Sequence, residues 1–135
     1  MVGFSTKHLP HQPDAIAPDG SEVRLLVQLE RGSLAHFTLL PGQVSCAVAH
    51  RTIEELWYFL QGRGEMWRRL GDKEEVVTVE RGVAISLPCG THFQFRCLGD
   101  EALAAVGISM PPWPGEGEAY DVLGIWQPTV KPRQD

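Results

Sequence analysis

The sequence predicts an all-β protein built as one barrel or sandwich. Short apolar runs rich in β-branched and aromatic residues recur about every eight to twelve residues. Glycine, proline or an Arg-Gly or Gly-Asp pair stands between these runs, where turns are expected, and no stretch has a convincing apolar period of 3.6 residues. Strands joined by tight turns at this spacing are typical of antiparallel sandwiches and barrels.

Composition narrows the class of protein. A chain of 135 residues, 43% hydrophobic and 21% charged, has the size and composition of one soluble domain with one core. The formal charge is -5 and the only dense basic segment is Trp67-Arg68-Arg69, so nucleic acid is not an expected partner. No apolar run approaches the roughly 20 residues of a membrane helix, and no membrane role is expected. Three cysteines match no zinc-binding spacing and no leader precedes them, which favours a reducing, cytoplasmic setting.

Each expected strand is closed by a turn. Residues 1–18 hold three prolines, two histidines and little periodicity, and we expect them to form an extended arm over the domain surface. Pro18-Asp19-Gly20 is then a turn, because proline presets the first turn position and glycine accepts positive φ. Core strands are expected over residues 22–29, 34–40, 44–50, 54–61, 65–70, 74–79, 83–87, 92–97 and 103–110.

The chain is expected to leave the core after residue 110. Pro111-Pro112-Trp113-Pro114-Gly115 is unsuited to a sheet interior because proline donates no ladder hydrogen bond. It is therefore a loop whose tryptophan closes a pocket, plugs one end of the barrel or docks a partner. Residues 120–126 are expected to form an edge strand or a helical turn, and residues 127–135 a frayed tail. We expect one domain over residues 1–135, with a core at about 23–110, an arm at 1–18 and a loop and tail at 111–135.

Several turn residues and polar residues, at Gly42, His50, Glu55 and Gly62 and again at Gly82 and Gly90, follow the spacing of the two cupin motifs. The matching residues are Gly42, Val48-Ala49-His50, Glu55 and Gly62 for the first motif, and Gly82 with Pro88-Cys89-Gly90 for the start of the second. The chain thus resembles a small single-domain cupin over roughly residues 23–110. The resemblance implies a jelly-roll barrel, the double-stranded β-helix, usually dimeric and with a pocket inside one mouth.

The same resemblance implies a degenerate metal site. In cupins the metal ligands are typically two histidines and a glutamate of the first motif and a histidine of the second. His50 and Glu55 are retained here, but Val48 and Phe93 stand at the other two positions, with His92 one place early. Side chains on a strand alternate faces, so His92 would point outward if Phe93 points inward, unless a bulge intervenes. The candidate ligands for a divalent transition metal are therefore His50, Glu55 and His92, and a catalytic metal generally takes at least three protein ligands.

His36 is a reserve ligand. Along residues 34–40 either His36-Thr38-Leu40 or Ala35-Phe37-Leu39 faces the pocket. The second set is more apolar, which favours an outward or rim position for His36.

The residues around His50 and Glu55 predict an aromatic pocket. Strand alternation places Glu55 on one face with Trp57 and Phe59. The expected ligand-binding residues are Val48, Trp57, Phe59, Phe93 and Phe95, in which case Gln94 and Arg96 point out of the barrel. His50 and Glu55 supply the polar anchor, either as a buried hydrogen-bonded pair or as a catalytic base and the group that orients it.

Two functions follow, and the sequence favours the first. One is a binding protein for a small, mostly apolar or aromatic molecule without a complete metal site, since Val48 and Phe93 are apolar. The other resembles cupin dioxygenases, isomerases or decarboxylases that would use His50, Glu55 and a third ligand on Fe, Mn, Ni or Zn. A barrel that serves only for dimerisation is a third reading. The second face of residues 54–61 is also apolar, so a second sheet or a second subunit is expected to cover it, and we predict a homodimer through such a face.

Overall fold

The computed structural model describes residues 3–131, and their regular structure consists of strands alone. The strands are β1 (Ala15–Ile16), β2 (Glu22–Leu29), β3 (Gly32–Leu39), β4 (Val48–His50), β5 (Glu54–Gln61), β6 (Arg63–Leu70), β7 (Lys73–Glu80), β8 (Ala84–Leu87), β9 (His92–Cys97), β10 (Leu103–Met110) and β11 (Ala119–Asp121). The prediction of an all-β protein is confirmed. No helix among the described residues is long and apolar enough to span a bilayer.

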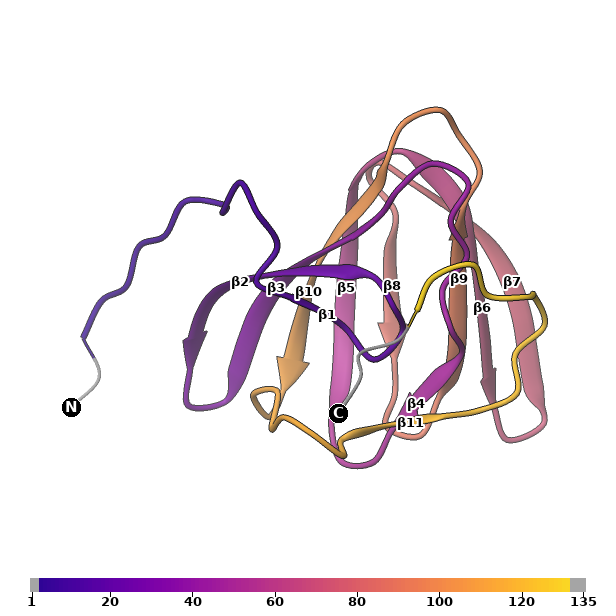
Figure 1. The fold of residues 1–135 in the computed structure, drawn as a ribbon. Coiled ribbons are helices and arrows are strands. Elements are labelled where there is room, and N and C mark those ends of the chain that lie inside the picture. Colours follow the sequence, from indigo (N-terminus) through magenta and orange to yellow (C-terminus); the bar gives the residue numbers. More distant parts are fainter. Residues whose placement is uncertain (1–2, 132–135) are drawn as a thin grey trace.

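The strands form two antiparallel sheets that face each other around one core (Figure 1). The six-stranded sheet has the order β1-β2-β3-β10-β5-β8, and the five-stranded sheet has the order β11-β4-β9-β6-β7. From β3 onward the chain crosses between the sheets at every connection except the β6–β7 hairpin. This alternation places strands distant in sequence side by side and confirms the expected jelly-roll barrel.

The core is built by side-chain alternation on facing strands. In β5 the buried residues are Glu55, Trp57 and Phe59, and the residues between them are exposed. Phe93 and Phe95 of β9 meet the indole of Trp57 edge-on, with ring centroids 5.9 and 5.2 Å away. Edge-to-face packing of this kind adds to the free energy gained from burying the rings. The predicted inward face of both strands is confirmed.

Strand β3 also presents its apolar set inward. Phe37 stacks on Trp57 with ring centroids 4.8 Å apart and an interplanar angle of 13°. His36 lies on the other face, where its Nδ1 is 3.4 Å from Thr38 Oγ1. Gly107 of β10 makes room for the stack, because a Cβ there would lie 2.7 Å from Trp57 Cδ1.

The N-terminal arm expected over residues 1–18 is attached to the barrel along part of its length. β1 pairs with the edge strand β2, with Ala15 opposite Val23. Pairing satisfies the backbone groups that an edge strand would otherwise leave open, so residues 14–18 join the barrel. Further toward the N-terminus, the guanidinium of Arg24 in β2 donates to the carbonyls of Pro10 and His11 at 2.9 and 3.0 Å. The chain before these contacts extends away from the barrel (Figure 1), and the side chain of Phe4 is fully exposed.

The C-terminal segment is more ordered than a frayed tail. Of residues 120–126, expected as a strand or helical turn, only Tyr120 and Asp121 are regular, as part of β11, but the chain continues across the five-stranded sheet (Figure 1). The backbone N–H of Thr129 donates to the carbonyl of Val44 at 3.0 Å, and Val130 packs against the core. The tail prediction is wrong up to residue 131, and residues 132–135 lie outside the described residues. Residues 44–47, expected in a strand, are irregular apart from a bridge at Val44.

Gln94 anchors this segment. It points out of the barrel as strand parity predicted, yet it is fully buried. Its Nε2 donates to the carbonyls of Ser45 and Trp126, each at 2.8 Å, and its Oε1 accepts from the backbone N–H groups of Ile125 and Trp126, each at 3.0 Å. All its hydrogen-bonding capacity is directed at backbone, which fixes the C-terminal segment over β9.

Candidate functional site

One mouth of the barrel opens into a cavity of about 640 Å³, the barrel cavity. It is bounded by strands of both sheets, by the turn at residues 17–19 and by the loop that contains Trp113. Apolar and aromatic side chains form most of its wall. Its buried polar residues are Asp19, His50, Glu55 and Ser109.

Glu55 is held in one orientation by two hydrogen bonds. Trp57 Nε1–H donates to Oε1 at 3.0 Å, and the hydroxyl of Ser109 donates to Oε2 at 2.5 Å. Trp57 lies on the same face two residues along β5, and Ser109 lies directly opposite Glu55 in β10. Burial raises the pKa of Glu55 above its usual value, although the two hydrogen bonds partly offset the effect. The hydrogen-bonded pair of His50 and Glu55 considered from the sequence is not formed.

His50 ends β4 and lies between two aromatic rings. The ring centroids of Phe93 and Trp113 are 5.4 and 5.5 Å away, both in edge-on arrangements. No hydrogen bond joins the imidazole to another side chain or backbone group of residues 3–131. Burial lowers the pKa of His50, and the nearby carboxyl of Asp19 partly offsets this. A neutral imidazole facing the cavity can accept or donate one hydrogen bond to a bound molecule.

Asp19 is a site residue that sequence reasoning missed. Its Oδ1 accepts hydrogen bonds from the backbone N–H and hydroxyl of Ser21, at 2.9 and 2.6 Å. Its Oδ2 accepts none from the described part of the chain, and the residue lines the cavity while only 4% exposed. Burial raises the pKa of its carboxyl. Pro18-Asp19-Gly20 signals a turn, and only the pairing of β1 with β2 places that turn at the cavity.

Glu118 and β11 position His50. Ala119 pairs with His50, and the Glu118 carboxylate accepts hydrogen bonds from the backbone N–H groups of Thr52 and Ile53 at 2.8 and 3.1 Å. The Thr52 hydroxyl donates to the other carboxylate oxygen at 2.5 Å. Burial alone would raise the pKa of Glu118, but these hydrogen bonds lower it. A charged side chain thus closes the turn that joins His50 to β5.

The structure places three of the five expected ligand-binding residues at the cavity. Val48, Trp57 and Phe93 line it, whereas Phe59 and Phe95 are buried in the core beneath Trp57. Trp113 of the proline-rich loop lines the cavity next to His50.

The residues present do not fit a metal ion. Val48 stands directly opposite Phe93 in the β4–β9 pair, so apolar groups fill two positions where the family implies histidine. His92, on the opposite face of β9 from Phe93, is not brought to the cavity to complete a set with His50 and Glu55. Among residues 3–131 no group of three or more His, Cys, Asp or Glu side chains is arranged to hold a metal.

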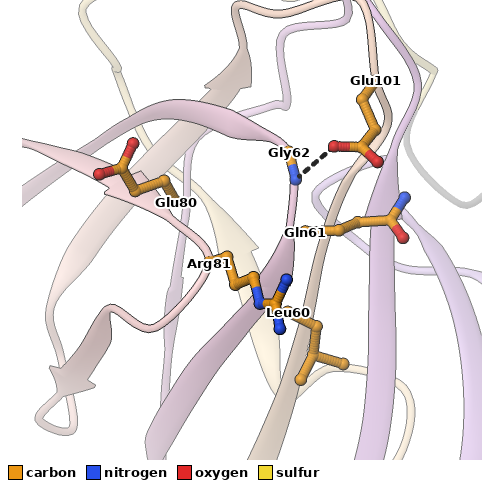
Figure 2. A pocket seen from close by; sticks show the side chains of 6 residues that line it. All are labelled: Leu60, Gln61, Gly62, Glu80, Arg81 and Glu101. Atoms are coloured by element: carbon orange, nitrogen blue, oxygen red, sulfur yellow. Dashed lines mark hydrogen bonds between the residues drawn. The ribbon is translucent and has the colours of Figure 1, made fainter.

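A second hollow, of about 420 Å³, lies at the other end of the barrel, and Figure 2 shows the residues that line it. It is formed where the β5–β6, β7–β8 and β9–β10 connections meet, and its lining residues are Leu60, Gln61, Gly62, Glu80, Arg81 and Glu101. The Glu101 carboxylate points toward the β5–β6 turn and accepts a hydrogen bond from the Gly62 N–H at 3.2 Å (Figure 2). All but Gly62 are exposed, so bulk water competes for their polar groups, and the barrel cavity is the better candidate site.

Solved structures share this fold at low sequence identity. Bacillus subtilis oxalate decarboxylase at pH 4.6 has a TM-score of 0.68 and 17% identity, covering 81% of this chain and 29% of that one. Staphylococcus aureus CapF, a capsular polysaccharide assembling protein, has a TM-score of 0.63 and 17% identity, covering 77% of this chain and 32% of that one. The chain therefore spans about a third of the length of these proteins. At this identity the likeness shows the fold alone.

The sequence itself matches one family. No curated protein matches it significantly. Residues 35–109, more than half of the chain, match the family described as Cupin domain, and this range contains His50, Glu55 and Phe93. The chain belongs to the cupin domain family.

Proposed function

We propose that the protein binds a small, mostly apolar or aromatic molecule in the barrel cavity, without a complete metal site. The observation that carries the proposal is the cavity of about 640 Å³, whose apolar wall meets a few buried polar groups. Pockets of roughly 300–1,000 Å³ with this composition are typical of small-molecule sites. The apolar wall would provide most of the affinity, and His50 and Glu55 would orient the ligand.

The alternative function is a metal-dependent cupin dioxygenase, isomerase or decarboxylase. It is supported by the shared fold with oxalate decarboxylase, a protein described with Mn(II) centres. It would use His50, Glu55 and a third ligand. Because Val48 and Phe93 fill two ligand positions with apolar groups, binding without metal has the stronger support.

Filling the cavity is expected to weaken binding of a small molecule. Ala35 lines the cavity from β3, and in Ala35→Trp the indole would occupy the space of a ligand. We expect the neutral fluorescent probe N-phenyl-1-naphthylamine to bind the natural protein at one site per chain. The variant should lower its affinity by about tenfold or more, since about 1.4 kcal/mol of lost contact suffices. Fluorescence titration measures both.

Val76→Trp is the matched control. Val76 lies on β7 in the other sheet and is 45% exposed, so the same substitution there adds an indole without entering the cavity. The control should bind the probe like the natural protein. Absence of probe binding by the natural protein, or equal loss in both variants, would contradict the proposed function.

Elemental analysis separates the two candidate functions. Protein purified without a nickel column is expected to contain less than stoichiometric Fe, Mn, Ni or Zn. Stoichiometric metal that disappears in His50→Ala would establish the metal-dependent alternative instead.

We also propose that the chain forms a homodimer through the outer face of β5 and β10. Leu56 and Tyr58 are 50% and 49% exposed, and Ile108, which pairs with Leu56, is 39% exposed. A contiguous apolar face of this kind is typical of an interface. Light scattering at micromolar concentration should give twice the chain mass of 15.0 kDa. The double variant Leu56→Glu/Tyr58→Glu should be monomeric, and a monomeric natural protein would refute the dimer.

A further inference from the structure

The barrel cavity contains two buried carboxyl groups and little positive charge. Asp19 and Glu55 are 4% and 3% exposed. Among its lining residues the basic side chains are His50 and Lys7, and Lys7 is an exposed residue of the N-terminal arm. Burying a carboxylate without a cationic partner lowers the stability of the folded protein. If the cavity bound only neutral apolar molecules, no ligand would offset this loss for its two carboxyl groups.

The two carboxyl groups differ in how many of their oxygens accept hydrogen bonds from the protein. Both oxygens of Glu55 accept hydrogen bonds, from Trp57 and Ser109. Asp19 uses only Oδ1, for Ser21, so Oδ2 is available to a bound molecule. A carboxylate oxygen in a partly dry site binds most strongly to a charged N–H donor.

Aromatic rings lie around the same groups. Trp57 stacks on Phe37, and both line the cavity together with Phe93 and Trp113. The π-faces of such rings attract cations when water is excluded. Carboxyl groups and aromatic rings on one wall therefore favour the same kind of ligand group.

We propose that the ligand of the barrel cavity is an amine, with a protonated ammonium group held by Asp19 and Glu55 and an apolar or aromatic body against the rings. The inference rests on the proposed function and assigns ligand binding to Asp19. The ammonium supplies the positive charge that the cavity wall does not. A bound ammonium would favour the ionised forms of both carboxyl groups, whose pKa burial raises.

Other charged groups near the site do not reverse this preference. Glu118 lies close enough to His50 to affect its titration and adds negative charge. Burial favours neutral His50, and Lys7 is exposed, where solvent screens its charge. An anionic ligand would instead meet two buried carboxyl groups.

Three probes of one size and different charge test the proposal. We expect 2-phenylethylamine, measured by displacement of N-phenyl-1-naphthylamine, to have a Kd at least tenfold lower than that of 2-phenylethanol. The titration is made at about pH 8, because an alkyl ammonium with a pKa of about 10 stays charged there. Phenylacetate should bind more weakly than the alcohol.

Asp19→Asn keeps the Oδ1 acceptor for Ser21 and removes the negative charge. It should weaken amine binding by about tenfold more than it weakens alcohol binding. Glu55→Gln is a second variant with the same expectation, which keeps the test decisive if one variant fails to fold. Asp72→Asn, in the exposed β6–β7 turn, is the control and should change neither affinity.

Two failures can be told apart. Equal affinity for amine and alcohol, or equal weakening of both by Asp19→Asn, overturns the amine proposal while probe binding upholds the proposed function. Failure of the natural protein to bind even the neutral probe overturns the proposed function and the amine proposal with it.

Discussion

Trp57→Ala is expected to lower the free energy of unfolding by about 3–5 kcal/mol, the range for truncating a buried tryptophan. The indole is 2% exposed and stacks on Phe37. It also donates a hydrogen bond to Glu55, so truncation leaves a buried carboxyl with one donor fewer. The lost packing and the lost hydrogen bond to the Glu55 carboxyl both lower the free energy of unfolding.

Urea unfolding followed by circular dichroism measures this change without relying on the removed fluorophore. Trp57→Phe is the matched variant, because it keeps an aromatic ring between Phe37 and Phe95 and removes the N–H donor. It should cost about 1–2 kcal/mol, close to the loss of one hydrogen bond with a small cavity. A loss below about 1 kcal/mol in Trp57→Ala would show that the stacked ring is not a main support of the core.

Glu55→Gln is expected to stabilise the protein by about 1–3 kcal/mol near pH 8, the usual cost of burying a poorly compensated polar group. The amide oxygen can still accept from Trp57, and the amide N–H can donate to the Ser109 oxygen. What the variant removes is the buried charge. The same change should weaken binding of an amine, a trade of stability against function.

The pH dependence identifies the cause of this stabilisation. The folded-state pKa of Glu55 is raised above its ordinary value of 4.5, so its contribution to stability is complete below that pH. The contribution is lost as pH rises through the folded-state pKa. The stability difference between variant and natural protein should thus be near zero below about pH 4, grow as pH rises and then level off.

Glu54→Gln is the control for this series. Glu54 is the preceding residue and is exposed, so its substitution should change stability by less than about 0.5 kcal/mol at every pH. Thermal or urea unfolding from pH 4 to 8 gives all three curves. A Glu55→Gln difference that does not vary with pH would show that the carboxyl charge is not the cause.

Much of the fold could be predicted because local patterns encode it. Alternation in residues 54–61 predicted that Glu55 and Trp57 are buried, and the structure confirms it. The apolar alternation in β3 also correctly predicted that His36 points away from the cavity. The ends were predicted less well. The arm and the tail carry little periodicity, and their order comes from partners far along the chain, such as β2 for β1 and Gln94 for the C-terminal segment.

The site was predictable only in part for the same reason. Motif spacing identified His50 and Glu55, and parity placed Phe93 inward. Neither could show that Ser109 stands opposite Glu55, since that depends on the register between β10 and β5. Phe59 and Phe95 were assigned to the pocket because alternation gives the face of a side chain and not its depth.

The sequence by itself determined the all-β class, the cupin family, the inward faces of the strands and the replacement of two metal-ligand positions by Val48 and Phe93. Those properties reside in residue type and local spacing. The tertiary structure decided which groups hydrogen-bond Glu55, left the His50 imidazole without a hydrogen bond from residues 3–131, and placed Asp19 at the cavity. These depend on which distant segments pair, because a jelly roll brings strands from the two ends of the chain to one barrel mouth.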